Sequence, residues 1–214
     1  MKEKIGEVFS VTANNIPIPG CTVSKSITVD TAYYSLASGT DISAEIYPYF
    51  KLFFVDSGEA EVYFERKSVK CSAGECVLAP YDIPVGVRTD KDTVYTEITI
   101  RRESIMNKMI NAGEVFKLAD LVPYSDGKIV NMDVVSNEKM KFVVMAFDEG
   151  CALSEHAAPG DALIFALDGE GIIGYEDKEN LIKAGEAFRF AKGGRHYVKA
   201  TAKFKMALLI TLEN

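Results

Sequence analysis

The sequence contains no tryptophan, two histidines and four cysteines. Cys21, Cys71, Cys76 and Cys151 form no C-x-x-C pair, which argues against a zinc knuckle or a redox dithiol. No run of about 18 apolar residues occurs, so no membrane-spanning helix is expected, and the first residues lack the apolar stretch of a secretory signal. We therefore expect a cytoplasmic protein with reduced cysteines and no membrane partner.

Basic residues are fewer than acidic ones. Lysine and arginine total 24 against 31 aspartates and glutamates, so the formal net charge is −7. A broad basic surface for nucleic acid is therefore not expected. The hydrophobic fraction of 48% and the charged fraction of 26% are those of a globular protein, and 214 residues suffice for one large domain or two small ones.

The chain repeats itself. The tetrapeptide at residues 6–9, Gly-Glu-Val-Phe, recurs at residues 113–116. Residues 39–87 also align without a gap onto residues 150–198, and 13 of the 49 aligned pairs are identical, where unrelated sequences would match at about 3. Many of these identities are glycines and turn residues, which mark the ends of strands. The sequence therefore predicts a duplicated domain.

Both copies have the pattern of short strands separated by Gly, Pro, Asp and Ser. Residues 203–210, for example, alternate between apolar and mostly polar side chains, as in a half-buried strand. A spacing of about ten residues between strands is typical of an all-β sandwich or barrel. The predicted strands include 52–55, 60–64 and 94–100 in the first copy and 163–167, 171–175, 187–191 and 204–212 in the second.

The segment between the copies has a helical pattern instead. Ile105, Met106, Met109 and Ile110 fall on one helical face, and Gly113 follows at a position suited to end a helix. We therefore expect two domains, at 1–101 and 123–214, joined by a short helical connector at 102–122.

Both histidines lie in the second copy, at spacings that point to a known family. The stretch from Gly150 through His156 to Gly169-Glu170, followed by Ala184-Gly185-Glu186 and then Gly193-Gly194-Arg195-His196, resembles the two sequence motifs of the cupin superfamily. The resemblance covers both halves, so the chain is similar to a bicupin. It implies an all-β fold of two tandem jelly-roll (cupin) barrels, of which the N-terminal one is degenerate.

The resemblance also implies where a metal would bind. In metal-binding cupins, two histidines and a glutamate of the first motif converge with a histidine of the second. By position these are His156, Ala158, Ala162 and His196 here, so two of the four ligands remain. Two imidazoles leave coordination positions to be filled by water or another donor. We therefore expect at most one weakly held divalent metal (zinc, nickel or iron) at His156 and His196.

Several roles stay open for this pair. Asp161 could contribute to a ligand or metal site only if the backbone bulges, because strand alternation turns it away from the face of Ala162. Without a metal, the histidines could hydrogen-bond a small ligand or act as acid and base. The alternative is a solvated His156 beside Glu155 and a His196 packed in a turn.

The first copy has lost the corresponding residues. Glu45 aligns with His156, Lys51 with Ala162 and Val85 with His196, so no metal centre can be assembled there. Glu45 and Lys51 could form an ion pair in or at the mouth of the barrel, or both could be solvated on its rim. In either case the first half is expected to supply shape and interface.

The expected function is binding of a small polar ligand in the C-terminal barrel. The resemblance suggests as one alternative a metal-dependent isomerase or dioxygenase acting on a sugar acid or similar metabolite; a non-catalytic sensor or assembly module is the other. No catalytic residue can be named. Because both faces of the 163–167 strand are apolar, one face should contact the partner barrel or a second subunit, so a homodimer is one alternative.

Overall fold

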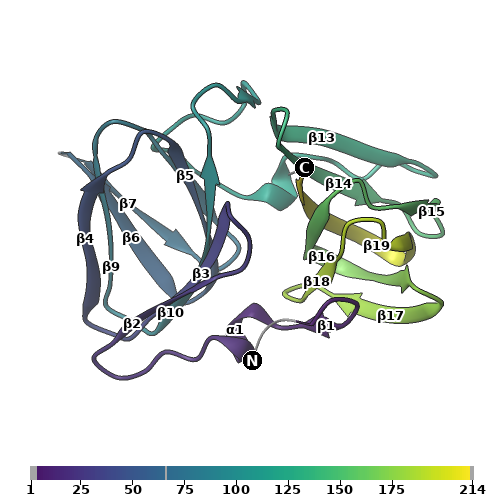
Figure 1. The fold of residues 1–214 in the computed structure, drawn as a ribbon, viewed down its shortest axis with the longest axis horizontal. Coiled ribbons are helices and arrows are strands. Elements are labelled where there is room, and N and C mark those ends of the chain that lie inside the picture. Colours follow the sequence, from purple (N-terminus) through teal and green to yellow (C-terminus); the bar gives the residue numbers. More distant parts are fainter. Residues whose placement is uncertain (1–3, 66, 213–214) are drawn as a thin grey trace. The chain divides into compact units, whose positions relative to one another are not determined.

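The computed structural model describes residues 4–65 and 67–212, and it is almost entirely β-structure (Figure 1). The one α-helix of the described residues, α1, has four residues. The predicted all-β class is therefore confirmed. In chain order the elements are β1 (Val8–Phe9), α1 (Val11–Asn14), β2 (Thr22–Ser26), β3 (Thr31–Leu36), β4 (Thr40–Ile46), β5 (Phe50–Ser57), β6 (Glu59–Phe64), β7 (Lys67–Ser72), β8 (Cys76–Ala79), β9 (Pro84–Thr89), β10 (Thr93–Ile100), β11 (Ile105–Met106), β12 (Val115–Phe116), η1 (Leu118–Asp120), β13 (Ile129–Ser136), β14 (Met140–Phe147), β15 (Ala152–Ala157), β16 (Asp161–Tyr175), β17 (Lys178–Lys183), β18 (Ala187–Phe190) and β19 (Arg195–Thr211).

The chain forms two compact units. Of the described residues, those between 11 and 117 form one unit, and residues 4–10 with residues 118–212 form the other. This division differs from the expected one at 1–101 and 123–214, because β1 pairs with β18 and β12 pairs with β8. The first copy of the repeated Gly-Glu-Val-Phe tetrapeptide thus contributes edge strand β1 to the C-terminal unit. The second copy contributes edge strand β12 to the N-terminal unit.

The N-terminal unit is a jelly roll of two antiparallel layers. One layer has the strand order β12-β8-β5-β10-β3-β2, and the other has the order β4-β9-β6-β7. Alternate residues of the strands face inward, so apolar side chains from both layers meet between them. This core contains, among others, Leu36, Phe53, Val55, Val62, Val77, Val85, Val87 and Tyr95.

The C-terminal unit has the same order of strands, with two of them continuing from one layer into the other. One layer runs β1-β18-β16-β19-β14-β13, and the other runs β15-β19-β16-β17. The long strands β16 and β19 serve both layers because their register shifts between Ala166 and Asp168 and again between Gly169 and Gly171. The core here includes Phe147, Ile164, Ile173, Phe188, Phe190, Val198 and Phe204.

Equivalent glycines occupy like positions in the two units. Gly58 and Gly169 both have positive φ, at 80° and 69°. A side chain on Gly58 would collide with the carbonyl oxygen of Asp92, and one on Gly169 would collide with that of Lys203. Asp92 and Lys203 are themselves separated by the 111 residues of the repeat. Both glycines thus allow the same close approach of two backbones, which supports the predicted duplication.

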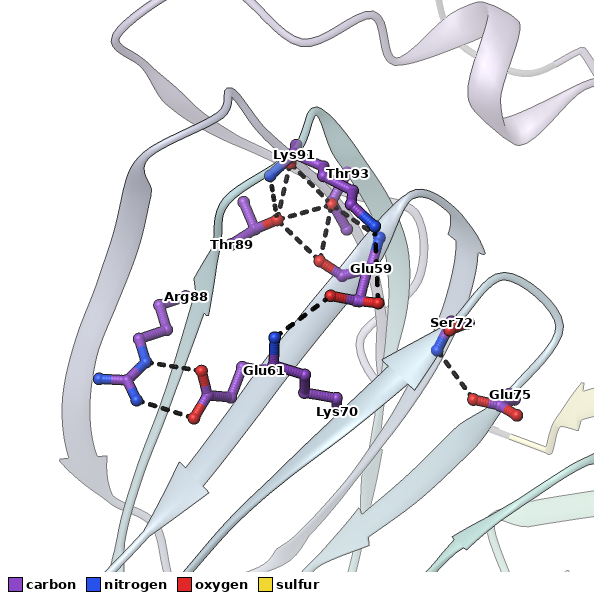
Figure 2. Close-up of polar contacts among 9 residues, drawn as sticks. All are labelled: Glu59, Glu61, Lys70, Ser72, Glu75, Arg88, Thr89, Lys91 and Thr93. Carbon is purple, nitrogen blue, oxygen red and sulfur yellow. Dashed lines mark hydrogen bonds and ion pairs between the residues drawn. The ribbon is translucent and has the colours of Figure 1, made fainter.

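The repeated Ala-Gly-Glu turn also has the same hydrogen bonds in both units. The carboxylate of Glu75 accepts from the backbone N–H of Ser72 at 2.9 Å (Figure 2), and that of Glu186 accepts from Lys183 at 2.8 Å. The N–H of Gly74 donates to Val55, as that of Gly185 donates to Ala166. The same turn chemistry thus fixes how β7 leads into β8 and β17 into β18.

The predicted helix in the connector is not formed. Ile105 and Met106 lie in β11, and the segment that follows is a series of turns, with one 3₁₀ turn at η1. The four apolar residues do not share one buried face: Ile110 is buried, but Ile105 is 76% exposed and Met109 is 64% exposed. A helix of two turns without tertiary packing is not stable.

Within the part of the chain that is described, no helix has the length and hydropathy needed to cross a membrane.

Candidate functional site

His156 and His196 lie directly opposite each other on neighbouring strands. They are a cross-strand pair between β15 and β19, and their ring centroids are 4.2 Å apart. A bulge between Leu153 and His156 adjusts the register just before the pair. The structure therefore brings together the two residues that motif spacing singled out, at a separation within reach of one shared ligand group.

The pair lies at the end of an apolar interior. His196 shares its strand face with the core residue Val198, and it is only 5% exposed. Its ring also contacts that of Phe190, with centroids 4.2 Å apart. His156 itself is exposed. The arrangement offers solvent access to one imidazole and an apolar wall beside the other.

Backbone carbonyls fix the tautomer of both rings. Nδ1 of His156 is 2.9 Å from the carbonyl oxygen of Ser154, and Nδ1 of His196 is 3.2 Å from that of Gly194. A carbonyl oxygen only accepts, so in each ring Nδ1 carries the proton and donates it. Each neutral ring then keeps its Nε2 lone pair for a donor or a cation, which is the orientation seen when a backbone carbonyl supports a binding imidazole.

Burial lowers the pKa of His196 below its ordinary value, and the neighbouring charge of His156 lowers it further, against an opposing effect of the Gly194 carbonyl. A buried imidazole without a carboxylate partner favours the neutral form because the charged form would lose its hydration. Near neutral pH, His196 is therefore an uncharged hydrogen-bonding group.

Buried core residues occupy the positions of the two missing cupin ligands. Ala158 and Ala162 are both buried, and both belong to the hydrophobic cluster inside the C-terminal unit. Among residues 4–65 and 67–212 there is no group of three or more His, Cys, Asp or Glu side chains that could hold a metal ion. The interior next to the histidines therefore presents methyl groups where a four-ligand centre would present donors.

Asp161 does not complete the site. One of its carboxylate oxygens accepts from the backbone N–H of Lys192 at 3.0 Å, and the other is 3.5 Å from the guanidinium of Arg189. Its side chain therefore anchors the turn after β18, as strand alternation predicts. Glu155, the other nearby carboxylate, accepts from Nε of Arg195 at 2.6 Å.

The N-terminal unit differs from expectation at the equivalent positions. Lys51 does not pair with Glu45; its Nζ lies 2.9 Å from Oε1 of Glu97, and both side chains are buried. The carboxylate of Glu45 instead accepts from the hydroxyl of Tyr47 at 2.5 Å. Of the two alternatives, the Glu45–Lys51 ion pair is not formed, because β10 supplies the carboxylate that Lys51 meets, and solvation on the rim holds for Glu45 but not for the buried Lys51.

Glu97 and the tyrosines around it were missed by sequence reasoning. No motif contains them, since they come from β3, β10 and the loop before β5. One signal was available: within the predicted strand 94–100, Glu97 falls on the same alternating face as Tyr95, so an inward-facing acid could have been noticed.

The C-terminal unit and the whole chain both have known relatives. Residues 143–212 match the Cupin domain family. A solved structure of a Cupin 2 conserved barrel domain protein from Leptotrichia buccalis is 25% identical, covers 99% of both chains and superposes with a TM-score of 0.87. No curated protein matches the chain.

More distant structures share the fold alone. AerE from Microcystis aeruginosa is 15% identical over 92% of this chain and 96% of its own, with a TM-score of 0.54. A salicylate 1,2-dioxygenase from Pseudaminobacter salicylatoxidans is 10% identical over 99% of this chain and 85% of its own, with a TM-score of 0.68. The family match thus identifies a cupin domain at residues 143–212, and the Leptotrichia buccalis structure extends the likeness to a cupin barrel protein over the whole chain.

Proposed function

We propose that the C-terminal cupin domain binds a small polar ligand through His156 and His196. The Nε2 atoms of the two rings would accept hydrogen bonds from hydroxyl or N–H groups of the ligand. Phe190 and the apolar core beside His196 would exclude water from the buried side of the contact. Asp161 is not part of this proposal, because Lys192 and Arg189 already occupy its carboxylate.

The main observation behind the proposal is that both imidazole rings are held in the same way and lie next to each other. Each Nδ1 donates to a backbone carbonyl two residues earlier, and the ring centroids are 4.2 Å apart. Because Nδ1 of each ring is already bonded to a backbone carbonyl, the second nitrogen is left to form a hydrogen bond with water or with a ligand. No partner for either Nε2 is present among the described residues.

The donor set does not fit a cupin metal centre with four protein ligands. Two imidazole nitrogens remain, the other two positions carry alanine, and Glu155 and Asp161 are paired elsewhere. Most of the coordination shell of a divalent ion would have to come from water or solute. The geometry therefore favours ligand binding over a metal-dependent isomerase or dioxygenase, and the dioxygenase neighbour at 10% identity supports the fold only.

We also propose that the N-terminal unit is a second, degenerate cupin barrel. Its strand order matches that of the C-terminal unit layer by layer, and the equivalent turns have the same hydrogen bonds. The cytoplasmic location and a homodimer stay predictions.

Imidazole ¹⁵N NMR of the whole protein tests the ligand proposal. The probes are galacturonate, which is a sugar acid, its neutral counterpart galactose, and zinc chloride. We expect a sugar probe to shift the Nε2 resonances of both histidines, and His156→Gln or His196→Gln to weaken its binding about tenfold, as for loss of one hydrogen bond.

Glu155→Gln is the matched control, since Glu155 lies on the same strand beside His156 but bonds to Arg195. It should leave affinity for the probes unchanged. The proposal fails if neither sugar shifts the Nε2 resonances, or if both histidine variants bind the sugars as well as the wild type does.

A further inference from the structure

The N-terminal unit contains a buried polar cluster that the proposed function does not use. Lys51 and Glu97 are each 8% exposed and form their ion pair on the inner face of the sheet. Lys51 lies on the same face of β5 as Phe53 and Val55, and Glu97 lies on the same face of β10 as Tyr95. Phe53, Val55 and Tyr95 belong to the core. The pair therefore lies at the end of the barrel interior, where apolar packing gives way to charge.

Tyrosines enclose this pair. The ring of Tyr47 packs against Nζ of Lys51, with 3.6 Å between the nitrogen and the ring centroid. Tyr49 lies beside Tyr47, with ring centroids 5.4 Å apart, and Tyr34 stacks on Tyr95 at 5.0 Å with nearly parallel planes. The rings of Tyr34, Tyr47 and Tyr49 are half-buried, so they form a rim that solvent reaches. We call this set, with Glu45 on the rim, the tyrosine cluster.

The hydroxyl at the bottom of the tyrosine cluster has no partner. Tyr95 is 1% exposed, and its oxygen makes no hydrogen bond in the part of the chain that is described. Tyr95 and Glu97 lie two residues apart on the same face of β10, and Tyr34 stacks on the ring of Tyr95. Burial raises the pKa of the Tyr95 hydroxyl, and the charges of Glu97, Tyr34 and Tyr47 raise it further. A buried hydroxyl without an acceptor is costly, and such groups in native proteins call for an explanation.

The donors and acceptors of the cluster select a type of ligand. The hydroxyl of Tyr95 and the ammonium of Lys51 can donate, while the carboxylates of Glu45 and Glu97 accept. An anion would meet two carboxylates and one ammonium, which is a net repulsion. An ammonium ion offers only donors and would leave the proton of Tyr95 without an acceptor. Hydroxyl groups both donate and accept, and the carbon face of a polyol packs well against tyrosine rings.

We propose that the tyrosine cluster is a second binding site, which takes a small uncharged molecule with neighbouring hydroxyl groups, such as a monosaccharide or a cyclitol. The Tyr95 hydroxyl is closed to solvent in the free protein, so the ligand must turn aside the half-buried ring of Tyr34 that stacks on Tyr95. One ligand hydroxyl then accepts from Tyr95 and donates to Glu97, and a tyrosine of the rim covers the ligand. The ion pair of Lys51 and Glu97 holds the carboxylate in place before the ligand arrives. This site is independent of the histidine pair.

Tyrosine-ring NMR of the whole protein tests the proposal, with glucose, xylose and myo-inositol as polyol probes and choline and acetate as charged controls. Each is added to about 50 mM, which is enough to detect a millimolar dissociation constant. We expect at least one polyol to shift the ring resonances of Tyr95 and Tyr34. Tyr95→Phe should weaken the binding of that polyol about tenfold, as expected for the loss of one hydrogen bond.

Tyr95→Phe should not lower the unfolding temperature of the ligand-free protein, because the hydroxyl removed has no partner there. Tyr63→Phe is the matched control, since the hydroxyl of Tyr63 donates to the carbonyl of Ile42 in the same unit, outside the cluster; it should leave the affinity unchanged. His156→Gln should also leave these shifts unchanged, which separates the two sites. The proposal is overturned if no polyol shifts the rings, if choline or acetate binds more tightly than every polyol, or if Tyr95→Phe binds as the wild type does.

Discussion

Lys51 and Glu97 form a 2.9 Å ion pair in which both side chains are about nine-tenths buried. Burial raises the pKa of Glu97, and the ammonium of Lys51 opposes that rise. The free-energy cost of desolvation thus offsets much of the attraction between the charges, so the pair adds little net stability. Either charge left alone in this environment would destabilise the protein.

This balance predicts a non-additive pair of substitutions. Lys51→Met should lower the free energy of unfolding by about 3–5 kcal/mol, because it leaves the Glu97 carboxylate buried and unpaired. The double variant Lys51→Met, Glu97→Leu should recover most of that loss, since two apolar side chains then fill the space. Urea unfolding of the two single variants and the double variant measures the coupling. If the double variant loses as much as the two single variants combined, the ion pair is not the source of the cost.

A second prediction concerns pH. The folded-state pKa of His196 is lowered by burial and then by the charge of His156, whereas the unfolded chain keeps a value of about 6.5. Below that pH the unfolded state binds a proton that the folded state resists, so the His196 contribution to stability is full above about pH 6.5 and declines as the pH falls towards the folded pKa. Burial raises the pKa of Asp56 to about 7, and protonation of this carboxyl acts in the opposite direction over the same range. Urea unfolding between about pH 7.5 and pH 5 measures this slope.

His196→Gln should lose less stability than the wild type as the pH falls between these values, because glutamine does not titrate and the contribution of Asp56 is the same in both proteins. His156→Gln should leave a decline, since burial is the larger cause of the His196 shift. An unchanged slope in His196→Gln would show that other groups set the pH dependence.

The glycines of the repeat give a third prediction. Gly169 and Gly150 both have positive φ, but a side chain on Gly169 would strike the Lys203 carbonyl whereas one on Gly150 meets open space. Gly150→Ala should therefore cost about 1–2 kcal/mol from backbone strain alone. Gly169→Ala should cost more, because the β16–β19 pairing must also shift. Equal losses in thermal unfolding of the two variants would contradict this account.

The sequence predicted those features that depend on local residue preferences and on motif spacing. The glycines at 58 and 169 require a particular backbone, so their recurrence predicts equivalent turns, and the motif spacing predicts that His156 and His196 meet. It failed where the outcome depends on packing. The apolar stripe at 105–110 predicts a helix only if a surface covers it, and Ile105 is exposed instead.

The partner of Lys51 could not be predicted for a related reason. Alternation places Lys51 on the inner face, but which carboxylate it meets depends on the register of β5 against β10, which places Thr99 opposite Lys51 and Glu97 opposite Phe53. That register is set by the whole sheet and not by residues near Lys51 in sequence.

A fourth prediction uses the exposed contact between Arg88 and Glu61 (Figure 2). Two guanidinium nitrogens of Arg88 donate to the two oxygens of Glu61, at 3.0 and 2.7 Å. These hydrogen bonds, followed by one from Ser68, lower the pKa of Glu61 to about 2. The pair is on the surface, so Arg88→Lys should leave the unfolding temperature nearly unchanged. The Glu61 pKa should rise towards its usual value, which carboxyl ¹³C NMR would measure. A Glu61 pKa unchanged in Arg88→Lys would contradict the assignment of its shift to the paired hydrogen bonds.

The last prediction separates ligand binding from metal dependence. Metal sites stabilise a fold when protein ligands close them, because the binding free energy is then part of the folding free energy. Here two imidazoles adjoin an interior that is already packed, with Ala158 and Ala162 in its core, so folding should not need an ion. Adding a chelator to protein purified without a histidine tag should therefore change the free energy of unfolding by less than about 1 kcal/mol. A loss above about 3 kcal/mol would mean occupancy far beyond the dissociation constant, and it would require further ligands at this site. Glu155 would then be the first residue to substitute, because its carboxylate is the acidic group next to His156 in β15, and release from Arg195 would free it to bind.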